Sequence, residues 1–240
     1  MKNKTIIDKL VKEARMGRLS RRTFMHYSVA AGITASTASG LWTSSALASP
    51  SRGGTFRLGA HDGNTSDTHD PGTYLSFSMI QLAHTFRSYM TMIMPDGSLG
   101  GDIATEWSAN TGATEWTFKL NNNATFHSGS KVTANDVIAS LNHHRGEEST
   151  SAAKALLADV VDISNNGDSI TMKVGSGNAD LPWLLTDYHI PICPANADGT
   201  INWQSGDGSG PYKLVETEFG VRYRLVRHDG WHGEGAYFNE

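Results

Sequence analysis

The sequence predicts an α/β fold, and three stretches carry that prediction. In residues 116–120 apolar and polar side chains alternate, which is the period-two pattern of a strand with one buried face. Thr133 is followed three residues later by Asp136, an acidic form of the capping box, so we expect a helix to begin directly after Thr133. Residues 160–174 hold two alternating runs around an Asn-Asn-Gly-Asp turn, the pattern of a β-hairpin.

The other expected elements come from apolar periodicity and from turn residues. They are a first strand at 53–59, a helix at 76–89, a strand at 92–94, a helix at 151–158, a short helix capped by Asp180, a strand around Ile190, and a hairpin of strands 212–215 and 221–227. A polar loop, residues 60–73, follows the first strand. A loop of this length is typical of a functional or mobile segment.

Residues 1–48 are predicted to be an export signal. Arg21 and Arg22, followed by Phe24, resemble a twin-arginine signal, and Ala46 and Ala48 supply the small-x-small pattern ahead of a cut after residue 48. An ordinary secretory signal is the alternative, but the Gly, Ser and Thr content of the apolar stretch favours the twin-arginine form. Polar residues interrupt that stretch, so we do not expect it to span a membrane. No cysteine stands at the cut, so we expect a soluble periplasmic protein without a lipid anchor.

The charge distribution differs between the signal and the rest of the chain. The first 48 residues hold 8 of the 20 Lys and Arg but only 2 of the 24 Asp and Glu, which leaves a formal net charge of −10 on the remainder. Nucleic acid binding demands clustered basic residues, so a nucleic acid partner is not expected. Cys193, the one cysteine, is expected to be a small apolar core residue and excludes a cysteine-ligated iron–sulfur cluster.

Five short motifs beyond residue 100 occur in a fixed order. They are Ala104-x-x-Trp107, Trp116-x-Phe118-x-Leu120, Phe126-His127-x-Gly129, Thr133-Ala134-x-Asp136-Val137 and Gly208-x-Gly210-Pro211-Tyr212. Together they resemble the signature of the family 5 extracellular solute-binding proteins, the oligopeptide, dipeptide and nickel receptors of ABC importers. No single motif is decisive, but their common order makes coincidence an unsatisfactory explanation.

The resemblance implies a periplasmic binding protein-like fold of type II. It implies an N-terminal lobe with an inserted mixed α/β subdomain, and a second lobe that is missing from this chain. The expected divisions are 1–48 for the signal, 49–90 for the first segment of lobe I, 91–186 for the inserted subdomain, and 187–240 for the return segment of lobe I. On this basis the chain is expected to be the N-terminal fragment of a longer receptor.

The resemblance also implies that the protein captures di- or oligopeptides by closure of two lobes and delivers them to a membrane permease. The expected partners are a peptide or similar small solute, the ABC-importer permease and the twin-arginine export machinery, and no cofactor is expected. The sequence holds no G-x-S-x-G, H-E-x-x-H, P-loop or C-x-x-C motif, so we expect no enzyme activity. An exported enzyme is therefore disfavoured.

Ligand contacts are expected in two places. In the family the loop after the first strand faces the cleft, and the chain crosses back between subdomains near residue 188. The residues expected to contact ligand are His61, Asp62, Gly63, Asn64, Tyr188 and His189. Packing is an equal alternative for Tyr188. The residues that clamp peptide termini in the family come largely from the second lobe and are not transferred to this chain.

Two alternatives stay open. Nickel receptors belong to the same family, and a nickel or metallophore site would draw on His61, His69, His189, His228 and His232. No two of these histidines stand four residues apart on an expected helix, so a metal site is the less favoured hypothesis. The second alternative is a ligand sensor that docks on a signalling receptor instead of a permease.

Overall fold

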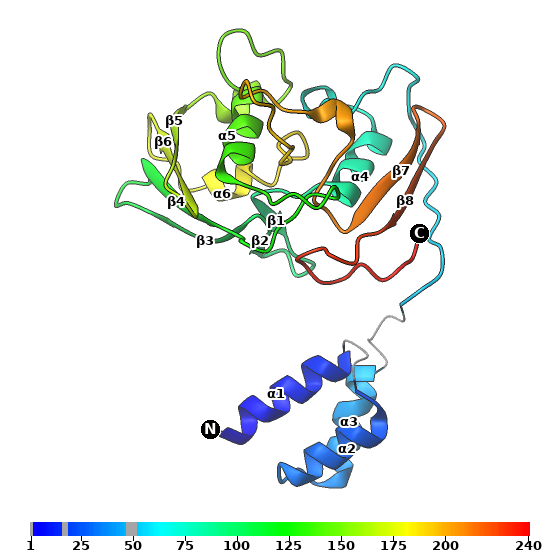
Figure 1. Ribbon diagram of the computed structural model, residues 1–240. Helices are drawn as coiled ribbons and strands as arrows, with labels where there is room; N and C mark the ends of the chain where they lie inside the picture. Colours follow the sequence, from blue (N-terminus) through cyan, green and yellow to red (C-terminus); the bar gives the residue numbers. More distant parts are fainter. Residues whose placement is uncertain (1, 16–18, 47–51) are drawn as a thin grey trace. The chain divides into compact units, whose positions relative to one another are not determined.

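The computed structural model describes residues 2–15, 19–46 and 52–240 (Figure 1). Its contacts divide the chain into two compact units, Met1–Gly54 and Thr55–Glu240. Each unit is described here by itself.

The N-terminal unit holds three helices, α1 (Lys2–Arg15), α2 (Arg21–Ala30) and α3 (Ala35–Ala46). Ser20 begins α2, because its side-chain oxygen accepts a hydrogen bond from the backbone N–H of Thr23 at 3.2 Å. Among the helices that the structure describes, none is long and apolar enough to cross a membrane. The predicted cut after Ala48 lies outside the described residues.

The second unit is organised around a four-stranded antiparallel sheet (Figure 1). Its order is β3 (Ala104–Ala109), β4 (Glu115–Leu120), β6 (Ser169–Val174) and β5 (Val160–Asn165). The predicted alternation in β4 is confirmed, since Trp116, Phe118 and Leu120 are buried and the residues between them are exposed. Trp116 lies directly opposite Met172 of β6 and Phe118 opposite Ile170, so cross-strand apolar pairs form the centre of the core.

Helix α5 (Ala134–His143) begins where the capping box predicts. Both bonds of the box are present: the Thr133 hydroxyl accepts from the N–H of Asp136 at 3.4 Å, and the Asp136 carboxylate accepts from the N–H of Thr133 at 2.8 Å. Val137 and Leu141 from this helix are fully buried in the core of the sheet. The second carboxylate oxygen of Asp136 accepts from the N–H of Ala195 at 2.7 Å, so one side chain fixes the helix and a distant segment together.

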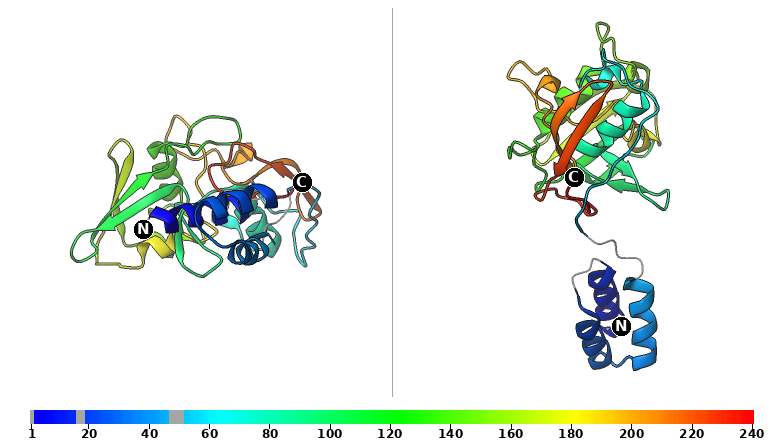
Figure 2. Two further views of the ribbon diagram at one scale, coloured as in Figure 1. Left: turned by 90° about the horizontal axis from the view of Figure 1, so that it is seen from below. Right: turned by 90° about the vertical axis from the view of Figure 1, so that its right-hand side faces the viewer.

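A second, smaller core lies between helix α4 and a two-stranded sheet (Figure 2). Helix α4 (Phe77–Phe86) buries Met79, Leu82, Ala83 and Phe86, and strands β7 (Tyr212–Glu218) and β8 (Arg222–Arg227) pack Leu214, Tyr223 and Leu225 against it. The remaining strands, β1 (Thr91–Ile93) and β2 (Leu99–Gly101), form a hairpin. The hairpins predicted at 160–174 and 212–227 and the strand at 92–94 are therefore present.

The glycines of Gly208-x-Gly210-Pro211-Tyr212 have a structural role. A Cβ atom at Gly208 would lie 2.0 Å from the carbonyl oxygen of Phe86, and one at Gly210 would lie 2.7 Å from the backbone nitrogen of Arg87. The N–H of Gly210 donates to the carbonyl of Phe86 at 3.0 Å, and the N–H of His127 donates to the carbonyl of Gly208 at 2.7 Å. Only glycine permits this close approach to the backbone of Phe86 and Arg87. The bond from His127 to Gly208 joins two of the sequence motifs in space.

Two predicted strands are absent. Residues 53–59 form no strand. The N–H of Phe56 donates one backbone hydrogen bond, at 2.8 Å, to the carbonyl of Glu240. Around Ile190 the chain is buried but irregular. The N–H of Ile192 donates a single backbone hydrogen bond to the carbonyl of Ser88 at 2.8 Å and starts no strand pairing. Alternating apolar residues favour a strand only where a neighbouring strand supplies the ladder, and neither segment has such a neighbour.

Two predicted helices are modified. The helix expected at 151–158 is a short 3-10 turn, η2 (Lys154–Leu157). Helix α6 (Leu181–Leu184) begins after Asp180, but the Asp180 side chain makes no capping bond. Pro182 at the second position of α6 has no N–H, and the N–H of Trp183 at the third position donates to the backbone carbonyl of Asp180 at 2.9 Å instead of to its side chain. Two further 3-10 turns are η1 (Pro71–Thr73) and η3 (Trp203–Ser205).

Candidate functional site

The loop that was expected to contact ligand is fixed to the start of α4 by Asp62. Its two carboxylate oxygens accept from the backbone N–H groups of Phe77 at 2.8 Å and of Ser78 at 3.1 Å. The bond from Phe77 is the main cause of an Asp62 pKa below its ordinary value. A carboxylate at the positive end of a helix is stabilised there, so Asp62 holds the loop in place.

Gly63 and Asn64 form the next part of this loop. A Cβ atom at Gly63 would lie 3.2 Å from the Cα of Gly220, and one at Gly220 would lie 2.8 Å from the carbonyl carbon of Asn64. The loop therefore lies against the turn of the β7–β8 hairpin. The Asn64 side-chain oxygen accepts from the N–H and the hydroxyl of Ser66, so Asn64 shapes its own turn.

The His61 side chain is more exposed than that of Asp62. The side chain of His61 is 78% exposed, its ring lies 5.2 Å from the ring of Phe77, and its Nε2 lies 3.9 Å from the Asp62 carboxylate. The imidazole is thus held near the first turn of α4 with its polar edge available to solvent.

Tyr188 and His189 lie in a different environment. The His189 ring is buried, with Nδ1 at 2.8 Å from the Asp187 carboxylate and Nε2 at 2.8 Å from the carbonyl of Tyr74. Tyr188 is half-buried, packs on the α4 core and has its ring centroid 4.0 Å from that of His189. Both ring nitrogens of His189 are engaged within the protein, which favours packing over ligand contact for this pair.

The two groups of expected ligand residues share the α4 core as a neighbour. No hydrogen bond joins residues 61–64 to residues 188–189, which are all described, because the loop bonds α4 and the second pair bonds Asp187 and Tyr74. Their assignment as ligand contacts stays a prediction.

The five histidines proposed for a metal site are dispersed. The ring of His232 bonds the buried Asp102 carboxylate at 2.7 Å, and His228 faces the carbonyl of Gly210 at 3.3 Å, an oxygen that His127 also contacts at 3.1 Å. Across the described residues, no group of three or more His, Cys, Asp or Glu side chains is arranged to hold a metal ion.

The guanidinium of Arg87, the residue directly after α4, is buried. Arg87 is 2% exposed and donates from Nη2 to the carbonyl of His69 at 2.8 Å and from Nη1 to the sulfur of Cys193. Its guanidinium carbon lies 4.8 Å from the centroid of the Phe86 ring, a cation–π contact. Burial, with the nearby Arg87 charge, lowers the pKa of His69 to about 4, and burial raises the pKa of the Cys193 thiol. Cys193 is therefore a neutral core residue, as predicted.

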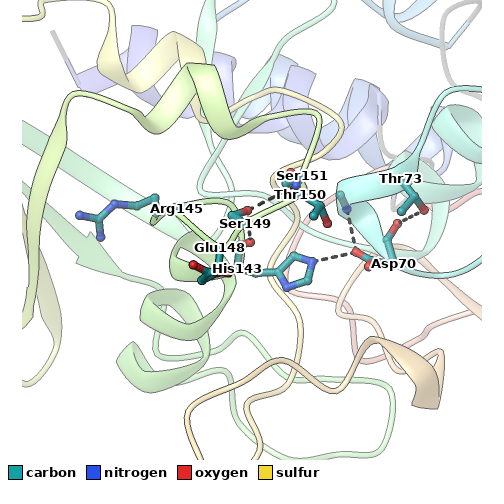
Figure 3. A pocket seen from close by; sticks show the side chains of 9 residues that line it. Asp70, Thr73, His143, Arg145, Glu148, Ser149, Thr150 and Ser151 are labelled. Atoms are coloured by element: carbon teal, nitrogen blue, oxygen red, sulfur yellow. Dashed lines mark hydrogen bonds and ion pairs between the residues drawn. The ribbon is translucent and has the colours of Figure 1, made fainter.

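A polar pocket of about 300 Å³ lies where η1 meets the segment after α5 (Figure 3). It is lined by Asp70, Gly72, Thr73, His143, Arg145, Glu148, Ser149, Thr150 and Ser151. Asp70 and His143 point toward one another, with His143 Nε2 at 2.7 Å from the Asp70 carboxylate (Figure 3). Burial alone would raise the pKa of Asp70, but hydrogen bonds from His143 and from the N–H of Gly72 outweigh it and keep the pKa below its ordinary value.

Sequence patterns did not indicate this pocket. Asp70-Pro71-Gly72 predicts a turn, and His143 predicts the end of a helix, where a cation is favoured. The two segments are more than 70 residues apart, so nothing local signals that they meet. Hydroxyl groups and charged side chains are among its lining residues.

Comparison with solved structures defines the class of protein. The fold matches a periplasmic binding protein, AgaA of A. tumefaciens R10 in complex with agropinic acid, with a TM-score of 0.65, 23% identity, and coverage of 72% of this chain and 36% of that one. It also matches the periplasmic murein tripeptide-binding protein MppA, with a TM-score of 0.62, 17% identity, and coverage of 71% and 37%. At these identities the likeness establishes the periplasmic binding protein fold.

The family follows from the sequence comparison. Residues 98–240 match the model of the bacterial extracellular solute-binding proteins, family 5 middle region, and the chain belongs to this family. A curated relative, the HTH-type transcriptional regulator SgrR of Pectobacterium atrosepticum, is 26% identical over 172 residues, which cover 71% of this chain and 30% of the relative. The chain thus spans about a third of the length of the relatives it matches.

Proposed function

We propose that this protein is a solute receptor of an ABC importer, which binds a peptide and presents it to the membrane permease. The observation that carries the proposal is family membership over residues 98–240, and the periplasmic binding protein fold supports it. Peptide is the favoured solute because the sequence motifs resemble oligopeptide and dipeptide receptors, and because the similar structure MppA binds a murein tripeptide. Binding of this kind needs no covalent chemistry.

The loop of residues 61–64 is the proposed contact of this chain with the solute. Asp62 fixes the loop to α4, the glycine contact with Gly220 fixes it to the β7–β8 turn, and His61 is left exposed. A loop held on two sides with one polar side chain free presents a preorganised contact, which lowers the entropy lost on binding. Backbone groups of such a loop suit the main chain of an extended peptide.

The test is a thermal-shift screen of the product of the whole gene against di- to pentapeptides, nickel and an opine such as agropinic acid. A ligand that binds only the folded state adds about 2.7 kcal/mol to stability at 100 times its Kd, so a peptide receptor gives a clear rise in Tm. A rise with nickel and none with peptides would replace the proposal by the nickel or metallophore alternative. A rise with the opine alone would assign a different organic solute.

Ligand sensing as part of a transcriptional regulator is the second candidate function, and it differs from the exported sensor that docks on a signalling receptor. The observation that favours it is the similarity to the transcriptional regulator SgrR. The predicted export signal favours import instead, because an exported protein is separated from the chromosome. We propose export by the twin-arginine route to the periplasm, directed by Arg21, Arg22, Phe24 and the cut after Ala48.

Cell fractionation tests this choice. The protein is expected in the periplasmic fraction, and the double substitution Arg21→Lys, Arg22→Lys is expected to retain it in the cytoplasm. Recovery of the wild-type protein from the cytoplasm would support sensing and contradict export.

A further inference from the structure

The paired arginines and the phenylalanine of the proposed export signal differ in their exposure. Arg21 and Arg22 stand in the first turn of α2 and are exposed, whereas Phe24 is 0% exposed. The Phe24 ring lies 5.5 Å from the Trp42 ring of α3, tilted by 52°. One face of the motif is therefore open to solvent while its aromatic residue is enclosed by the neighbouring helices.

The enclosing core consists of residues from all three helices. Ser28, one turn after Phe24, is 1% exposed, Ala38 of α3 is 0% exposed and Ala14 of α1 is 2% exposed. The chain reverses between α2 and α3 at Gly32, which has a φ of 86°, and Thr34 accepts from the N–H of Thr37 at the start of α3. Burial of Phe24 thus depends on α3 folding back onto α2.

Three features make this closed arrangement weak. The hydroxyl of Ser28 is buried without a hydrogen-bond partner in the part of the chain that the structure describes, and a buried unsatisfied hydroxyl destabilises the state that buries it. The first turn of α2 carries two arginines and no acidic residue, so positive charge meets the positive end of the helix dipole. Small residues fill much of the core, which limits the apolar area that closing removes from water.

We propose that the three-helix unit is a weak latch that conceals Phe24 and opens before the signal is recognised. This inference rests on the proposed twin-arginine export, and it adds a regulatory step to that route. In the closed unit a receptor can contact the two arginines but not Phe24. When α3 leaves α2, Phe24 becomes available beside them. Trp42 controls the opening, because its ring covers Phe24.

Thiol labelling of the full-length protein tests the closed state. Ser28→Cys places a thiol in the buried core, and His26→Cys places a matched thiol on the exposed face of the same helix. Cys193 is fully buried in the second unit, so it adds little background. Labelling of Ser28→Cys is expected to be at least about tenfold slower than that of His26→Cys, and Trp42→Ala is expected to abolish the difference. If the Ser28→Cys thiol is labelled at the same rate with Trp42→Ala as with native Trp42, the latch is overturned.

Export rates measured by pulse–chase test its consequence. Ser28→Ala removes the unsatisfied hydroxyl, so the latch is tighter and export is expected to be slower. Trp42→Ala opens the latch, and export is expected to be faster. Unchanged export in both variants would overturn the regulatory step. Normal export of the Arg21→Lys, Arg22→Lys variant would instead refute the twin-arginine route, while the labelling result would still decide whether Phe24 is concealed.

Discussion

The carboxylate of Asp136 gives the sharpest prediction about stability. It accepts hydrogen bonds from the N–H and hydroxyl of Thr133, at 2.8 and 2.6 Å, and from the N–H of Ala195 at 2.7 Å. Asp136→Ala leaves Thr133 as the N-cap of α5 but removes the half of the capping box that accepts from the N–H of Thr133, which is worth about 1 kcal/mol. It also leaves the N–H of Ala195 without its charged acceptor, which costs a further 1–3 kcal/mol, roughly. The expected loss in free energy of unfolding is about 3 kcal/mol.

Urea denaturation followed by tryptophan fluorescence measures this loss. The midpoint is expected to fall with an unchanged m-value, because the change weakens the native state and does not alter the surface exposed on unfolding. Asp180→Ala is the control, since Asp180 is an aspartate at the start of another helix, α6, but its side chain makes no capping bond. Its effect is expected to stay within about 0.5 kcal/mol. If the two variants lose equal stability, the capping argument is refuted.

Three further predictions concern the loop, the hairpin and pH. Gly220→Ala is expected to destabilise the protein more than Gly167→Ala and to weaken solute binding, because both glycines have positive φ but only a Cβ at Gly220 would clash with the loop backbone. Calorimetric Tm and ligand titration measure the two effects. Equal effects of the two substitutions on Tm would contradict this prediction. His61→Ala is expected to weaken solute binding at unchanged Tm, whereas Asp62→Ala is expected to lower both the affinity for solute and the Tm, since only Asp62 is hydrogen-bonded to α4. An unchanged Kd in both variants would show that the loop is not part of the binding site. Burial lowers the pKa of His144 from 6.5 to about 3, so the unfolded state takes up the proton first as pH falls. Stability is therefore lost from about pH 6.5 downward, by about 2 kcal/mol at pH 5. His144→Gln is expected to flatten the pH dependence of Tm between pH 7 and 5. An unaltered slope of Tm against pH would show that His144 is not the group responsible.

The elements that the sequence predicted well depend on neighbouring residues. The alternation in β4, the capping box of α5 and the Asn-Gly turn between β5 and β6 each lie within a few residues, and each is present. The strand expected at 53–59 failed for the opposite reason, because a strand needs a partner from elsewhere in the chain. Its apolar residues Phe56 and Leu58 are instead exposed.

The candidate site shows the same limit. Residues 61–64 were proposed from the family resemblance, but the capping role of Asp62 depends on Phe77, fifteen residues away. The pocket beside Asp70 depends on a contact with His143, which no local pattern indicates. Likewise, Gly208 and Gly210 belong to one of the five sequence motifs, but only the fold shows that they lie against Phe86.

The order of strands in the large sheet has a consequence for folding. Strands β3 and β4 are adjacent in the chain, as are β5 and β6, so each pair can form as a local hairpin. The junction of β4 with β6 must wait until residues 121–168, which include α5, are compact enough to bring the two hairpins together. We expect the assembly of this seam to limit the folding rate, so substitutions at the Trp116–Met172 pair should slow folding.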